Sequence, residues 1–263
     1  MLFEQTKRVK YAKCPLKSVI CQIRFPSILA ITNDLPVAFQ ETLRETYPDF
    51  QQLLEEQNQI VLDKNNEDST PKPRFIQNKS KNYKFSTADK KYSINLTNTF
   101  ISLTTSDYTT WEDFKSHFVS PLYSFMQIYK PAYFSRIGLR YIDAFNYEVY
   151  GLTDATLNLF FNHAVLGCFS EEKLSEHIRS LQQSFELDLP NGYYARILTT
   201  KAHITGEQQP SLIFDSDFIS ASRCSALNTE VESIMDSLHC EASGFIHWVI
   251  SDKMEALMEP SDL

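Results

Sequence analysis

Alternating apolar and polar residues predict several β-strands in the first part of the chain. In Ser18–Phe25, apolar side chains fill one face with the period of two that is typical of a half-buried strand. An apolar stripe between Leu35 and Phe50 predicts a helix, which we expect Asp34 to cap and Pro48 to end. Further short strands are expected at Asn58–Asp63, Phe75–Thr87, Lys91–Leu96 and Thr99–Thr105, with a polar loop at Lys64–Pro73.

The strongest helical pattern is Trp111–Tyr129, where aromatic and aliphatic residues recur every three or four positions. Thr109 or Thr110 is expected to cap this helix, because two acidic residues follow in its first turn. Pro121 lies inside the pattern, so we expect a kink or a break near His117–Ser120.

The order of predicted elements partly repeats after residue 150. The aromatic and β-branched run Tyr133–Ile142 closes the first part as a strand. Helices are then expected at Asp154–Ala164 and Glu171–Arg179, strands at Ser184–Leu189, Tyr193–His203 and Ser211–Ser220, and closing helices at Asn228–His239 and Gly244–Met258. We therefore predict an α+β fold of two related halves, residues 1–150 and 151–263, in which mainly antiparallel sheet packs with helices. One compact domain is the alternative.

Composition and charge argue against several classes of function. Six glycines in 263 residues, none of them clustered, leave no glycine-rich dinucleotide or phosphate loop. A net charge of -8 makes nucleic-acid binding an unexpected role. We expect no signal peptide, no membrane span and, from five widely spaced cysteines, reduced thiols and a cytoplasmic location.

Histidine and cysteine spacing predicts neither a metal site nor a cofactor. The sequence has no CxxC, HExxH or GxSxG motif, so catalytic residues stay unassigned. His239 and His247 have related helical positions, but we expect Gly244 to separate them into two helices.

Two predicted strands carry like charges at alternating positions. Arg136 and Arg140 share one strand face with Gly138 between them, and Asp215 and Asp217 share a face of a later strand. The arginines can clamp an anion, and the aspartates can bind a divalent cation or position a water. The alternative is that arginines and acids form cross-strand ion pairs, which stabilise a sheet modestly.

Aromatic residues make up 13% of the chain and are favoured at protein interfaces. Candidate interface residues are Trp111, Tyr141, Tyr193 and Tyr194. The alternative is that such side chains fill the core and keep their hydroxyl groups at its edge.

Three motifs resemble those of a sporadically distributed family of uncharacterised bacterial proteins of similar length. They are residues 108–114 (YTTWEDF), 136–142 (RIGLRYI) and 214–218 (FDSDF), and the resemblance extends over nearly the whole chain. The chain departs from the family pattern at Asp143, where Asn is usual, and at Phe214, where Leu is usual. The patchy distribution of the family implies an accessory role of the defence or toxin–antitoxin kind.

These observations lead to two hypotheses about function. The first is a non-enzymatic protein-interaction or binding component, whose partner is the product of a neighbouring gene or a second copy of the chain. The second is an enzyme or sensor that binds an anionic small molecule through Arg136 and Arg140 with Asp215 and Asp217.

Overall fold

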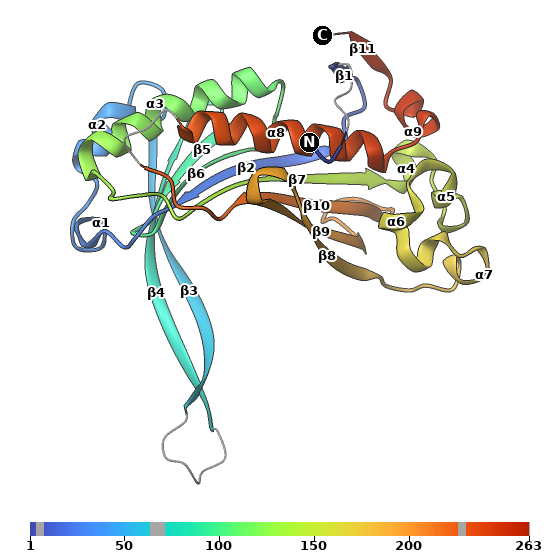
Figure 1. Ribbon diagram of the computed structural model, residues 1–263, viewed down its shortest axis with the longest axis horizontal. Helices are drawn as coiled ribbons and strands as arrows, with labels where there is room; N and C mark the ends of the chain where they lie inside the picture. The colour runs from blue at the N-terminus through green and yellow to red at the C-terminus, as the bar shows by residue number, and fades with distance from the viewer. Residues whose placement is uncertain (4–7, 64–71, 226–229, 263) are drawn as a thin grey trace.

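One antiparallel sheet of nine strands forms the base of the structure in the computed structural model, which describes residues 1–3, 8–63, 72–225 and 230–262 (Figure 1). Its strands are β2 (Leu16–Arg24), β3 (Asp49–Asp63), β4 (Lys72–Ser86), β5 (Tyr92–Leu96), β6 (Phe100–Thr105), β7 (Arg136–Asn146), β8 (Gln182–Asp188), β9 (Tyr193–Ala202) and β10 (Ser211–Ser220). They lie in the order β3-β4-β5-β6-β2-β7-β10-β9-β8. Together with its helices, the sheet confirms the predicted α+β class.

Two long helices cover one face of this sheet (Figure 1). Helix α3 (Trp111–Tyr129) packs on β5 and β6, and helix α8 (Glu230–Val249) packs on β7 and β10. The shorter helices are α1 (Leu29–Asn33), α2 (Val37–Leu43), α4 (Tyr147–Tyr150), α5 (Leu157–Phe160), α6 (His163–Leu166), α7 (Glu172–Ser175) and α9 (Asp252–Leu257). No helix in the described ranges combines the length and the apolar character that a membrane span requires.

The same order of elements occurs twice along the chain. Strand β2, two short helices, the meander β3–β6 and α3 are followed by β7, four short helices, the meander β8–β10 and α8. In each set the last meander strand pairs with the first strand of the set, and β2 pairs with β7 between them. The topological repeat begins at β7, whereas the sequence pattern placed the division after residue 150. Because β7 pairs with both β2 and β10, one sheet runs through both sets.

Strands β3 and β4 form a hairpin that projects from the body of the protein (Figure 1). They pair along their whole lengths, but only residues 83–86 of β4 also pair with β5. The strands predicted at Asn58–Asp63 and Phe75–Thr87 are therefore parts of longer ones. Of the predicted loop Lys64–Pro73, residues 64–71 lie outside the described part, and the last two belong to β4.

Helix α3 forms where its apolar stripe predicts it. Thr110 is the cap, and its side-chain oxygen accepts a hydrogen bond from the Asp113 backbone N–H at 3.2 Å. The stripe buries Phe114, Phe118 and Phe125 against the sheet. The predicted break near residues 117–120 is absent. The helix continues through Pro121, which is buried.

Other helix predictions are wrong in their boundaries. Asp34 does not cap the helix predicted from Leu35, because it follows α1. Helix α2 begins after Pro36, which gives no side-chain cap. Phe50 belongs to β3, whose pairing with β4 replaces the last turn of the predicted helix. Gly244 does not separate two helices, since α8 runs unbroken through it. A glycine inside a helix costs about 1 kcal/mol, which the packing of α8 on two strands offsets. The start predicted at Asn228 lies outside the described residues.

The first and last described segments of the chain lie together beside α8. Strand β1 (Val9–Tyr11) pairs with β11 (Pro260–Asp262), and the ribbon continues through the backbone hydrogen bond from Lys13 to Met258. Phe3 packs edge-on against Phe245 of α8 at 5.3 Å between ring centroids. The segment before β2 is therefore held close to the helix layer.

Candidate functional site

A cavity of about 830 Å³ lies between the helix layer and the sheet. Its walls come from the segment Arg8–Leu16, the start of α3, the middle of α8, and the inward faces of β7 and β10. We call it the interlayer cavity. Residues that are far apart in the sequence converge on it.

Aromatic and neutral polar groups form one wall of the interlayer cavity. The Trp111 ring stacks on the His239 imidazole at 4.5 Å between centroids, and the Tyr141 hydroxyl lies 2.9 Å from Nδ1 of that imidazole. The Tyr108 ring lies edge-on to the Tyr141 ring at 6.2 Å between centroids. Burial and the nearby Arg8 lower the pKa of His239 to about 4, so its imidazole is neutral at pH 7. This wall therefore carries hydrogen-bonding groups without charge.

Two cations at the rim of the cavity pair with neighbouring acids. A guanidinium nitrogen of Arg8 lies 2.6 Å from the Glu112 carboxylate, and both side chains are exposed. The ammonium group of Lys115 lies 2.9 Å from Asp236, which also accepts a hydrogen bond from the Trp111 indole nitrogen at 2.8 Å. Opposite charges at the rim thus neutralise each other locally.

Asp143 is the buried acid of the interlayer cavity. It lies on the inward face of β7, between Leu16 of β2 and Phe214 of β10, and is 7% exposed. Within the described chain its carboxyl group has neither a hydrogen-bond nor an ion-pair partner, and burial alone raises its pKa to about 7. A buried carboxylate without compensation is costly, so this group marks a place where a ligand is expected.

Three weakly acidic groups lie near the Asp143 carboxylate and do not compensate its charge. They are the thiol of Cys14 and the hydroxyls of Tyr141 and Tyr150, and each has its pKa raised by burial and by this neighbour. The Tyr150 hydroxyl donates its hydrogen bond to the backbone carbonyl of Lys13 at 3.0 Å. All three groups are uncharged at neutral pH.

The four charged residues proposed from the sequence come together on the opposite face of the sheet. Arg136 lies 2.6 Å from Asp217, and Nε of Arg140 donates to Asp215 at 2.6 Å. This is the arrangement expected of cross-strand ion pairs. An anion that used the same guanidinium groups would have to displace an aspartate from each, and the pairs lie across the sheet from the interlayer cavity.

Gly138 has a defined role between the two arginines. A Cβ atom at this position would lie 2.5 Å from a guanidinium nitrogen of Arg136. The space that the missing side chain leaves is therefore filled by Arg136 itself, which reaches across it to Asp217.

The four aromatic interface candidates divide into two pairs. Trp111 and Tyr141 line the interlayer cavity and contribute to its wall. Tyr193 and Tyr194 are half-buried at the start of β9, and the Tyr193 hydroxyl is hydrogen-bonded to Ser237 of α8. The first pair therefore points to the inside of the protein and not to an outer surface.

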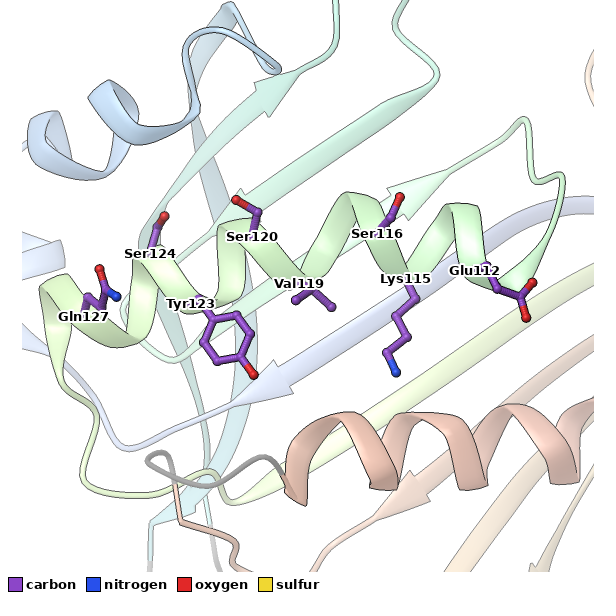
Figure 2. A pocket seen from close by; sticks show the side chains of 8 residues that line it. All are labelled: Glu112, Lys115, Ser116, Val119, Ser120, Tyr123, Ser124 and Gln127. Carbon is purple, nitrogen blue, oxygen red and sulfur yellow. The ribbon is translucent and has the colours of Figure 1, made fainter.

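A second hollow, of about 660 Å³, follows the outer side of α3 (Figure 2). Its lining consists of Glu112, Lys115, Ser116, Val119, Ser120, Tyr123, Ser124 and Gln127. Figure 2 shows Lys115 and Tyr123 pointing toward α8, where the Tyr123 hydroxyl donates to Glu232 at 2.8 Å. Because one helix supplies the whole lining, this hollow is a surface groove, and we place the candidate site in the interlayer cavity.

Neither metal chemistry nor known relatives assign a role to the site. No three His, Cys, Asp or Glu side chains gather as metal ligands in the part of the chain that the structure describes. No protein-family model matches the chain, and no curated protein matches it either. The family indicated by the three sequence motifs therefore stays a prediction.

The sequence interpretation missed Asp143 because it ended the strand at Ile142. Strand β7 extends to Asn146, so the inward alternation of Ile137, Leu139 and Tyr141 continues to Asp143. An acid in phase with the apolar face of a strand is the signal that points to this residue.

Proposed function

We propose that this chain is a binding protein whose small-molecule ligand occupies the interlayer cavity. The observation that carries this proposal is a partly open cavity of about 830 Å³ with a mainly apolar lining, in which aromatic side chains lie together with the buried carboxyl group of Asp143. Ligand sites in proteins have volumes of roughly 300–1,000 Å³ and the same mixture of apolar walls and sparse polar anchors.

The groups in the cavity favour binding over catalysis. A histidine whose pKa is about 4 is a weak base at neutral pH, and burial raises the pKa of the Cys14 thiol, which disfavours the nucleophilic thiolate. Among the residues that the structure describes, neither group is hydrogen-bonded to an acid or base that would activate it. The proposed role is therefore that of a non-enzymatic binding component.

Two expectations from the sequence continue as parts of this proposal. A protein partner, encoded nearby or formed by a second copy of the chain, would respond to the occupied or empty cavity. The accessory role that the family resemblance implies, in defence or a toxin–antitoxin pair, is compatible with such a ligand-dependent response.

Filling the cavity tests this proposal. Ala242 on α8 is buried and lines the cavity, so Ala242→Leu is expected to place additional atoms in the space that the ligand needs. Titration with the neutral fluorescent probe N-phenyl-1-naphthylamine should show saturable one-to-one binding to the wild type. We expect the dissociation constant of the probe to rise about tenfold or more in the variant, since the leucine side chain would occupy space that the bound probe needs.

The matched control is Ala256→Leu, which adds the same atoms to the exposed side of α9. This variant is expected to bind the probe as the wild type does. Absence of saturable binding to the wild type, or equal binding to all three proteins, would contradict a ligand site in the interlayer cavity. Circular dichroism checks that both variants are folded.

A further inference from the structure

The interlayer cavity contains one buried carboxyl group for which the described residues supply no counter-ion. Asp143 is 7% exposed, and no lysine or arginine contributes to the shift of its pKa. Three cations line the cavity and none pairs with Asp143: Arg8 is paired with Glu112, Lys115 is paired with Asp236 and Glu232, and Lys10 is an exposed side chain on β1. A positive group that entered from outside would meet an unpaired carboxylate.

The walls around this carboxylate suit a positive charge that is attached to an apolar body. Tyr108 lies just before α3, Trp111 begins this helix and Tyr141 lies on β7. Phe218 and Phe245 add aromatic surface from β10 and α8. Aromatic faces attract organic cations, and the attraction increases when the cation is removed from water. A bare metal ion fits less well, because it requires several oxygen or nitrogen ligands and Asp143 offers one carboxylate.

We infer that the interlayer cavity binds an organic ammonium ion with an apolar or aromatic body, and that Asp143 is its counter-ion. This inference rests on the proposed function and names the chemical class of its ligand. The ammonium group would lie against the Asp143 carboxylate, and the apolar body would lie between the aromatic side chains of the wall. The neutral Tyr141 and His239 are positioned to give hydrogen bonds to polar atoms of the ligand.

A pair of probes that differ only in charge tests this inference. Benzyltrimethylammonium carries a permanent positive charge, and neopentylbenzene is its neutral carbon analogue. Each is used to displace N-phenyl-1-naphthylamine from the protein at pH 8. We expect the wild type to bind the cation at least about tenfold more tightly than the neutral analogue, because only the cation pairs with the carboxylate.

Substitution of the acid should remove this preference. In Asp143→Asn the two probes are expected to compete equally, while the dissociation constant of the neutral fluorescent probe stays within about twofold of the wild type. Asp188→Asn is the control, because it removes an equal charge from the exposed edge strand β8, outside the cavity. This control should keep the full preference for the cation.

Protonation of Asp143 provides an independent arm of the same experiment. The cation is charged at every pH, so a change of its affinity between pH 8 and pH 6 reports on the protein. With a pKa of about 7, the carboxylate is mostly ionised at the first pH and mostly protonated at the second, so affinity should fall about tenfold. The facing groups Cys14, Tyr141 and Tyr150 remain neutral over this range, as does His239.

The possible outcomes separate this inference from the proposed function. Saturable probe binding without preference for the cation would overturn the inference and leave a cavity for neutral ligands. A preference that survives in Asp143→Asn would also overturn it, because another acid would then be the counter-ion. Failure of the neutral probe to bind in the cavity would contradict the proposed function itself.

Discussion

Replacing Asp143 with asparagine is expected to stabilise the protein by about 2 kcal/mol at pH 8, although it removes the proposed counter-ion. Burial raises the pKa of this carboxyl group from 3.8 to about 7, which corresponds to about 4 kcal/mol of unfavourable free energy when the group is ionised in the folded state. The substitution removes this cost, but about half of the resulting stabilisation is lost, because the asparagine amide is buried in the same place without a partner.

The stabilisation should depend on pH with a defined sign. Below about pH 3 the wild-type carboxyl group is protonated in both the folded and the unfolded state, so only the cost of burying the amide is left and the variant should be about 2 kcal/mol less stable than the wild type. As the pH rises from about 4 to about 7, the unfolded wild type ionises before the folded one and the wild type loses stability relative to the variant. Above about pH 8 the difference should be constant.

Urea unfolding of both proteins at pH 4, 6 and 8 measures this difference. A variant that is less stable than the wild type at pH 8 would show that the carboxylate makes a favourable interaction in the ligand-free protein. The expected result is instead typical of binding sites, where a residue that serves the ligand weakens the fold.

The second large effect is expected from Phe145→Ala, which removes a ring from the core of the second set of elements, β7 to α8. Phe145 is fully buried, and its ring contacts Phe161 at 4.9 Å and Phe214 at 5.9 Å between centroids. Deletion of a buried phenylalanine side chain costs about 3–5 kcal/mol, because apolar surface is lost and a cavity is left. We expect a loss of this size in the free energy of unfolding.

Denaturant unfolding followed by both tryptophan fluorescence and circular dichroism measures this loss. Trp111 and Trp248 lie on α3 and α8, so fluorescence reports on both sets of elements, and the two signals should change together because one sheet joins them. The control is Leu159→Ala, whose side chain is 49% exposed and should change the stability little. A similar loss in both variants, or two separate transitions, would contradict this description of the core.

The sequence predicts the elements whose pattern is local. The stripe and cap of α3 require only residues near each other in the chain, and so does the alternation of β7. The paired arginines and aspartates were also predictable as cross-strand partners, because alternation places each pair on one face. The sequence also shows that Gly138, which has no side chain, lies between Arg136 and Arg140 on the same strand face.

The interlayer cavity was not predictable in the same way. Its walls combine Cys14, Trp111, Asp143 and His239, which belong to separate segments and converge only when α8 packs on β7 and the segment before β2 lies beside it. The sequence places His239 and His247 on two helices, because glycine has a low helix propensity and Gly244 lies between them. In the structure α8 runs through Gly244, since tertiary packing overrides this weak local effect. The phase of Asp143 with the apolar face of β7 is the one local sign of the site.

The most direct test is a titration of the Asp143 carboxyl carbon by nuclear magnetic resonance, with and without saturating benzyltrimethylammonium. In the free protein the carbon should titrate with a pKa of about 7, since burial is uncompensated. A bound cation stabilises the carboxylate, so the pKa should fall by about one unit or more when the probe is present. A pKa near 4 in the free protein, or an unchanged value with the cation bound, would contradict the assignment of Asp143 as the counter-ion of a cation-binding cavity.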